Sequence, residues 1–451
     1  MTRSKILLTL CALGLAACAK PPAAPSPAAR TGLAAVHSAD PQQLDLPTYE
    51  RLTATVLAEA LRSGDRETVS LFTAYAEHHD PQPKSSQAIA RLALAETPAA
   101  ASREAGDPLR SKLEAIAQGR LGPLHLTEQS QIRFPRDEGD HASALTEWWY
   151  LNGHLETKGL GPLKRQFGYE FTLFKVGPLL HWAHVAVSDL TLRRFHYVRQ
   201  WIPARQALGS SEGLAQAYGP HRLRSLSDQR YALSSAFAEA GFDLQLTARK
   251  APLLIGGNGK IDMPEGKDSW YYSQTRFNAQ GTLTVGGTPQ TVTGISWLDH
   301  QWGPFFVSGF ADRWDWFSLQ FDDGSDYNLF AFRDKQGNPG ARHVNRSAVD
   351  GRGSVGSRYT MERLAWWQSP RTGLHYTTDW RITLPDTDET VELSARIKNQ
   401  EVARLLPFMQ DPLPHYWEGA MSATKRDRAG NQVKGRAYCE HFGLQKPEGP
   451  G

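Results

Sequence analysis

The residues best suited to chemistry form one short stretch, in which Asp299 and His300 stand side by side between Trp297 and Trp302. An acid and an imidazole are rarely placed beside two large aromatic side chains unless they are paired or used. One interpretation is a buried Asp–His pair that fixes the end of a strand. The other is a carboxyl group in an apolar cavity, where burial raises its pKa and lets it donate a proton.

Strand alternation bears on this choice. If the stretch is a strand, Asp299 shares a face with Trp297, and His300 points to the opposite face. His300 is therefore a candidate catalytic residue by its type, although adjacency alone does not make it the partner of Asp299. His184 is another candidate partner.

Three other motifs carry less chemistry. The segment 209–213 fits the G-x-S-x-G pattern of hydrolases, but it is a polar, small-residue loop without the buried strand and helix that the pattern requires. His181 and His184 are spaced like a metal pair, yet on a strand such side chains diverge, and no Cys or third His follows nearby. The segment 256–260 lacks the Ser or Thr of a P-loop. We expect no metal and no cofactor.

Composition indicates a folded, β-rich chain of two or three domains. The chain has 451 residues, 40% of them hydrophobic, and a formal net charge of only +3 without a dense basic block, which disfavours nucleic acid as a partner. Its 13 Trp, 39 Gly and 28 Pro are typical of many short strands and turns.

The N-terminus reads as a targeting segment. Residues 1–17 have a basic start and an apolar run too short to span a bilayer, which needs roughly 20 residues. The run ends Leu-Ala-Ala-Cys, which resembles a bacterial lipobox and predicts lipidation of Cys18; the alternative is an ordinary secretory signal ending near Ala17. Because Ala19 is not Asp, an outer-membrane lipoprotein facing the periplasm is favoured over an inner-membrane or free periplasmic protein. Of the remaining cysteines only Cys439 stays in the mature chain, and its context predicts a small buried apolar residue.

The rest of the chain divides into a tether, a helical region and two β regions. Residues 18–40, rich in Ala and Pro, are expected to be a flexible tether. Residues 41–120 carry apolar residues at helical spacing, with helix starts near Leu46, after Asp65, at Ser85 and at Asp107. Alternating patterns then predict antiparallel barrels or sandwiches over 130–308 and 309–445. The segments 147–151 and 315–319 share one pattern, an acid, Trp, an aromatic, any residue and Leu, which suggests two barrels of related design.

Several further stretches occur in a familiar order. They are Phe-Pro-Arg-Asp at 134–137, Glu-Trp-Trp-Tyr-Leu-Asn-Gly-His-Leu at 147–155, Gly-Tyr-Glu-Phe-Thr-Leu-Phe at 168–174, Ala-His-Val-Ala-Val-Ser-Asp at 183–189, Trp-Tyr-Tyr-Ser-Gln-Thr-Arg at 270–276, Gly-Ile-Ser-Trp-Leu-Asp-His-Gln-Trp-Gly at 294–303 and Tyr-Trp-Glu-Gly-Ala at 416–420. From about Ile132 to Gly443 the chain thus resembles the lipocalin-like AttH/CrtC family, named for the AttH component of ABC transport operons and for carotenoid 1,2-hydratase. The helical region lies outside this resemblance.

The resemblance implies a mainly β fold of two calycin/lipocalin-like antiparallel β-barrels and an apolar ligand. In the hydratase subfamily an acid protonates an isolated C=C bond and water captures the cation; carried over by motif, that acid is Asp299. Aromatic faces stabilise a cation by roughly 0.5–2 kcal/mol each. The candidate substrate-binding residues are Trp148, Tyr150, His184, Trp270, Tyr271, Tyr272, Trp297 and Trp302.

Two functions compete on this evidence. The first is a periplasmic protein, attached to the membrane through lipid on Cys18, that binds a lipid or isoprenoid in or between its barrels and serves as an accessory to an ABC transporter. The second is an acid-catalysed hydratase or cyclase that uses Asp299. A secreted hydrolase has the least support, because no triad can be assembled by motif.

Overall fold

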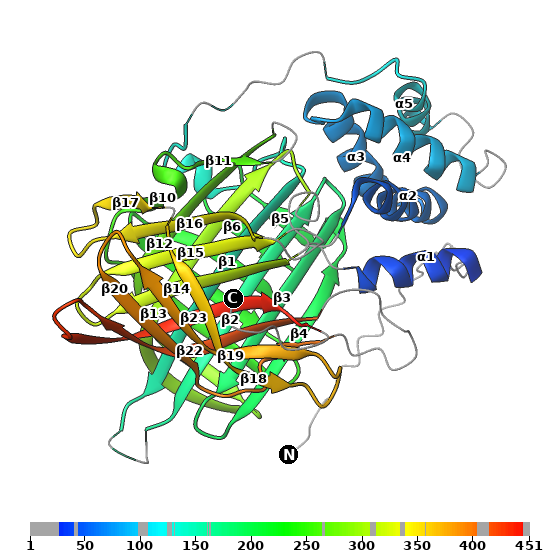
Figure 1. The fold of residues 1–451 in the computed structure, drawn as a ribbon. Coiled ribbons are helices and arrows are strands. Elements are labelled where there is room, and N and C mark those ends of the chain that lie inside the picture. Colours follow the sequence, from blue (N-terminus) through cyan, green and yellow to red (C-terminus); the bar gives the residue numbers. More distant parts are fainter. Residues whose placement is uncertain are drawn as a thin grey trace, which may run out of the picture.

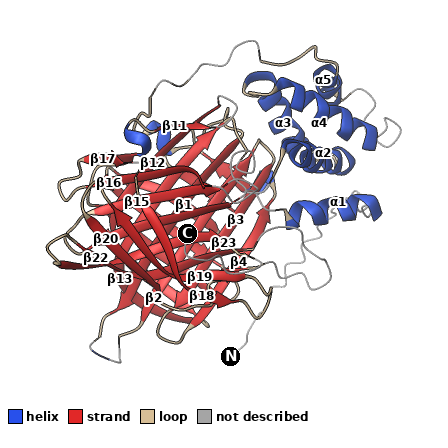
Figure 2. Cartoon of the chain, in the orientation of Figure 1, coloured by secondary structure: helices blue, strands red, loops and turns tan. Residues whose placement is uncertain are grey.

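The chain folds into two antiparallel β-sheets with a group of helices on one side of them (Figures 1 and 2). The computed structural model describes residues 27–39, 44–97, 107–123, 129, 131–159, 161, 164–263, 267–306, 313–333, 339–356, 358–403 and 415–444. The predicted signal peptide and Cys18 lie outside these residues. No helix in the described ranges combines the length and apolarity needed to cross a membrane.

The helices precede the sheets. They are α1 (Pro27–Ser38), α2 (Leu46–Ser63), α3 (Arg66–His78), α4 (Pro83–Glu96) and α5 (Pro108–Ala117). Both ends of α2 are capped: the Asp45 carboxylate accepts from the Thr48 amide at 2.9 Å, and Gly64 ends the helix at a φ of +75°. The start of the fourth helix is at Pro83 rather than Ser85, since Pro suits the first helical position.

The prediction of a flexible tether over 18–40 is wrong for its second half, because Pro27–Ser38 form α1. Alanines favour a helix once an apolar face can be buried, and Val36 is fully buried in the cluster that joins the helices to the first sheet. Tyr49 of α2 packs on the ring of Phe306, with ring centres 5.5 Å apart. The helical region is therefore attached to the β body through an apolar contact.

The first sheet has 13 strands and is a nearly closed barrel. Its main path runs β4-β3-β2-β1-β13-β12-β9-β8-β7-β6-β5. The strands are β1 (Thr146–Thr157), β2 (Gln166–Val176), β3 (Leu180–Asp189), β4 (Arg194–Ile202), β5 (Ala207–Gly209), β6 (Ala215–Tyr218), β7 (His221–Ser227), β8 (Arg230–Ala236), β9 (Ala240–Ala248), β10 (Leu253–Leu254), β11 (Lys260–Met263), β12 (Lys267–Val285) and β13 (Thr288–Gly303). The stretch that contains Asp299 is a central strand of this barrel.

The second sheet has ten strands and forms a half-barrel, with the main path β17-β16-β15-β14-β23-β22-β20-β19-β18. The strands are β14 (Arg313–Phe321), β15 (Asp326–Arg333), β16 (Pro339–Ser347), β17 (Gly353–Gly356), β18 (Thr360–Gln368), β19 (His375–Leu384), β20 (Glu389–Ala395), β21 (Glu401–Val402), β22 (Tyr416–Arg426) and β23 (Gln432–Phe442). Cys439 on β23 is buried and free, as its context predicted. The fold is mainly β, as predicted.

Three apolar clusters fill the interiors of the two sheets and the space between them. One cluster fills the first barrel and includes Trp149, and a second fills the half-barrel and includes Phe317. The third lies between the sheets, with Trp297 and Tyr271 from the first and Trp316 from the second. The outer face of the first barrel is therefore buried against the second sheet.

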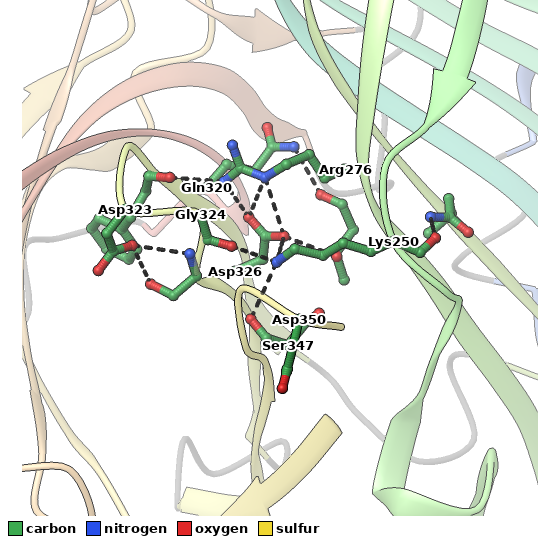
Figure 3. Close-up of polar contacts among 12 residues, drawn as sticks. Lys250, Arg276, Gln320, Asp323, Gly324, Asp326, Ser347 and Asp350 are labelled. Carbon is green, nitrogen blue, oxygen red and sulfur yellow. Dashed lines mark hydrogen bonds and ion pairs between the residues drawn. The ribbon is translucent and has the colours of Figure 1, made fainter. Parts of the chain in front are cut away.

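A buried ionic network holds the two sheets together (Figure 3). Lys250 donates to Asp326 Oδ2 of β15 at 2.6 Å, and Arg276 of β12 bonds the same carboxylate. The amide of Gln320 on β14 donates to the Ser296 carbonyl of β13 at 3.1 Å. Since Asp326 is fully buried and paired with two cations, these contacts fix one sheet on the other and so fix the walls of any space between them.

Candidate functional site

A pocket lies between the sheets, and β-sheet register builds its first wall. One row across β3, β2, β1, β13 and β12 contains His184, Thr172, Tyr150, Asp299 and Ser273. Directly opposed residues share a face, so these side chains all point away from the barrel interior toward the second sheet.

The next row on the same face is more apolar. It contains Phe174, Trp148, Gln301 and Tyr271. All four side chains line the pocket. The polar row with Asp299 is therefore bordered by an aromatic row.

The second sheet supplies the facing wall. The lining residues are Trp148, Tyr150, Thr172, Phe174, Ile261, Tyr271, Asp299 and Gln301 from the first sheet, and Trp314, Trp316, Phe330, Phe332, Tyr416, Glu418 and Glu440 from the second. Most are aromatic, as in pockets that bind apolar ligands, and the few polar groups among them can orient such a ligand.

On the first wall, Asp299 is the side chain best suited to donate a proton. Its Oδ1 accepts hydrogen bonds from Ser273 Oγ at 2.5 Å and Trp297 Nε1 at 2.6 Å, and its Oδ2 accepts from the Tyr271 hydroxyl. Burial raises the pKa of Asp299 to about 7, although the three donors act in the opposite direction. The carboxyl can therefore be protonated near neutral pH, and the same donors stabilise the carboxylate that forms when it gives the proton away.

The Tyr271 hydroxyl joins Asp299 to the second sheet. It accepts from Trp316 Nε1 at 3.1 Å and from Asn328 Nδ2 at 2.8 Å. Because both of its acceptor positions are filled from the second sheet, its proton is directed at Asp299. The orientation of the acid thus depends on contact between the sheets.

The opposite face of the same strands holds a different arrangement. Inside the barrel, Glu147 Oε1 bonds His141 Nδ1 at 2.7 Å and His300 Nε2 at 3.0 Å, while Lys175 Nζ lies 2.7 Å from Glu147 Oε2. Candidate metal-ligand atoms of the two His and the Glu lie within 4.8 Å of one another. The charge of Glu147 is already met by the Lys175 ammonium, which also pairs with Asp140, so the glutamate does not need a metal ion for charge balance.

The comparisons with known proteins agree with this architecture. Residues 125–444 match the model of the AttH-like family. The chain belongs to the AttH-like family. Among curated proteins, none has a significant sequence match to the chain.

Solved structures extend the AttH-like assignment to the fold. An AttH protein from Nitrosomonas europaea aligns with a TM-score of 0.62 and 25% identity, covering 70% of this chain and 98% of that chain. Kievitone hydratase from Nectria haematococca aligns with a TM-score of 0.56 and 17% identity, covering 69% of this chain and 93% of that chain. The helices α1 to α5 lie before the matched AttH-like range.

The AttH-like motifs supply residues to both faces of the first sheet, so the predicted site residues divide. Trp148, Tyr150, Tyr271 and Asp299 line the pocket. Two more lie beside it: Trp297 bonds Asp299, and His184 Nδ1 lies 2.8 Å from the hydroxyl of Tyr416. The remaining four lie inside the barrel and are His300, Trp270, Tyr272 and Trp302. His300 is therefore not placed to act with Asp299.

Sequence reasoning gave no site role to the second wall of the AttH-like fold. Trp316 stands in the 315–319 repeat of the 147–151 pattern, and Tyr416 and Glu418 stand in the motif 416–420. These two motifs could have indicated the second wall from the sequence, because both lie in β strands that contribute lining residues to the pocket.

Proposed function

We propose that this AttH-like protein binds an apolar, alkene-bearing ligand between its two sheets and that Asp299 protonates the ligand, as in a hydratase or cyclase. The observation that carries the proposal is a buried carboxyl, with a pKa raised to about 7, on the wall of an aromatic pocket. A general acid works best when its pKa lies near the operating pH.

The reaction balances with one acid and one water. The Asp299 proton adds to one alkene carbon, and the π electron pair forms the new C–H bond, leaving a cation at the other carbon. Trp148, Trp316 and Tyr150 line the pocket, and their aromatic rings supply the electron density that stabilises such a cation. Water then forms the C–O bond and returns a proton to the Asp299 carboxylate. If an internal double bond attacks instead of water, the product is a ring.

The substitution D299N tests this mechanism. Purified protein is incubated with the alkenes farnesol and geraniol in deuterium oxide, and products are analysed by mass spectrometry. We expect the wild type to add one water with one carbon-bound deuterium, and D299N to react about 10²–10⁴-fold more slowly. The exposed Asp243 on β9 gives the matched control, D243N. Turnover by D299N at the wild-type rate would exclude Asp299 as the acid.

A second candidate, binding without turnover as an accessory to an ABC transporter, is favoured by the AttH-like assignment and by the lipobox that ends at Cys18. We propose that Cys18 is lipidated and that the protein is held at the outer membrane, facing the periplasm. In C18S the diacylglycerol mass should disappear from the N-terminal peptide, and the protein should no longer follow outer-membrane fractions. An unmodified Cys18 in wild-type protein would contradict this anchoring.

A further inference from the structure

Two buried polar side chains stand next to each other on the outer face of the first barrel, and each has one atom without a partner. Asn152 of β1 pairs in register with Glu170 of β2, so the two side chains share a face. Both residues are almost fully buried. Within the described part of the chain, Asn152 Nδ2 and Glu170 Oε2 have no hydrogen-bond partner. Buried polar atoms are normally paired, so these two point to a small polar molecule.

The other polar atom of each side chain is held in place. Ser318 Oγ of β14 donates to Asn152 Oδ1 at 3.2 Å, which joins Asn152 to the second sheet. Thr172 Oγ1 donates to Glu170 Oε1. Because these bonds fix the amide and the carboxyl, Nδ2 and Oε2 are the atoms left to bind something else.

The pair lies one row of side chains from the proton donor. Tyr150 and Thr172 stand two residues along β1 and β2 from Asn152 and Glu170, and both line the pocket. Tyr150 pairs in register with Asp299. Side chains two residues apart on one face of a strand are separated by about 7 Å. A molecule held by the pair is therefore next to the wall that carries the acid.

Water is the molecule that fits these two atoms. The hydrogens on Asn152 Nδ2 would repel a metal cation, and the carboxyl of Glu170 would repel an anion. A water molecule accepts from Nδ2 and bonds Glu170 Oε2 in either protonation state of the carboxyl, whose pKa burial raises well above its usual range. Buried water makes about three hydrogen bonds, so one more can be made toward the pocket.

We propose, on the basis of the function proposed above, that Asn152 and Glu170 bind the water that captures the cation formed by Asp299, and so act as positioning residues for hydration. The water oxygen forms the C–O bond, and a proton of that water passes to the Asp299 carboxylate. A cation that water does not capture returns a proton from a neighbouring carbon to Asp299 and becomes an alkene again. The pair therefore favours the alcohol over this return.

Crystal structures of the wild type and of E170L test the water site directly. In the wild type we expect an ordered water within about 3 Å of both Asn152 Nδ2 and Glu170 Oε2. In E170L that water should be absent, because one of its two partners is gone. Wild-type crystals in which no water bonds these atoms would overturn the site. If E170L does not fold, N152L makes the same test from the other side.

The products formed in deuterium oxide test the role in the reaction. The full chain is incubated with farnesol, and mass spectrometry gives the ratio of hydrated product to farnesol that has gained carbon-bound deuterium. We expect this ratio to fall at least about tenfold in E170L, because Asp299 still protonates the alkene while the water is no longer held. E170Q keeps polar atoms that bond water, so its ratio should stay within about threefold of the wild type.

The matched control is Q166L on the same strand as Glu170. It removes the bond from Arg396 Nη2 to Gln166 Oε1, which joins the sheets at 2.7 Å away from the pocket lining, and it should leave the ratio unchanged. A wild-type ratio in both E170L and N152L would overturn the role of the pair, even with water bound there. If the wild type neither hydrates farnesol nor exchanges its hydrogens, the proposed catalysis itself fails.

Discussion

Two buried acids, Glu147 and Asp299, lie on opposite faces of the first sheet, and their surroundings shift their pKa values in opposite directions. Inside the barrel, the pKa of Glu147 is held well below its usual range, because Lys175 and His141 outweigh the effect of burial. In the pocket between the sheets, the pKa of Asp299 is raised to about 7 by burial. Both carboxyls are buried and both accept several hydrogen bonds.

The difference lies in the partners rather than in the depth of burial. Glu147 is paired with an ammonium, whereas Asp299 receives bonds from the neutral donors Ser273, Tyr271 and Trp297. A paired buried acid is fixed in its ionised form and cannot readily take up a proton. An unpaired acid with neutral donors can exist in both forms near pH 7, which is what proton transfer requires. This difference supports a structural role for the barrel cluster and the proton-donating role proposed above for Asp299.

Substitution of Glu147 in the barrel cluster should destabilise the protein more than substitution of Asp299. E147Q removes one of the two counter-ions of the buried Lys175 ammonium and leaves the other, Asp140, at 2.7 Å. Removing one partner of a buried pair costs about 3–5 kcal/mol of unfolding free energy, and since Asp140 remains we expect the low end of that range. Urea unfolding followed by circular dichroism measures this loss. D299N, at a position without a buried cation beside it, should cost much less at the same pH.

The double variant E147Q/K175M separates pairing from packing. With the ammonium gone, most of the lost stability should return, because Asp140, the other partner of Lys175, is partly exposed to solvent. If the double variant is as unstable as E147Q, the cluster is needed for its hydrogen bonds and not for charge balance. If D299N is destabilised as much as E147Q, the two environments do not differ as described.

The sequence predicted the barrel architecture because repeated motifs carry it. The pattern shared by 147–151 and 315–319 places its side chains in the same way in both sheets. Trp148 and Trp316 line the pocket, while Trp149 and Phe317 lie in the two cores. Strand alternation also separated Asp299 from His300 correctly. These features depend only on the alternation of successive side chains between the two faces of a strand.

The sequence could not show which aromatic residues face the pocket. On β12 the residues 269–275 are all buried, so large apolar residues occupy both sets of alternating positions. Tyr271 therefore looks like its neighbours Trp270 and Tyr272, although only Tyr271 lines the pocket. The wall with Glu418 was missed for a related reason, since it depends on how one sheet is placed on another far away in the chain.

A smaller effect is expected on how the free energy of unfolding changes with pH. The ordinary pKa of Asp299 is 3.8 and its pKa in the fold is about 7, so between these values the folded chain holds a proton that the unfolded chain has released. Its contribution is fully present below about pH 3.8 and is lost as pH rises through about 7. Relative to D299N, the wild type should therefore lose about 2 kcal/mol of unfolding free energy from pH 5 to pH 7.

Glu147 should show the opposite sign, because its pKa is lowered: its contribution is present above its unfolded pKa and is lost as pH falls through the folded one. Urea unfolding of wild type, D299N and E147Q/K175M at several pH values distinguishes the two. A difference between wild type and D299N that stays constant from pH 5 to pH 7 would mean that Asp299 is ionised throughout. In that case Asp299 could not donate a proton in the pocket, and the contrast between the two faces of these strands would be lost.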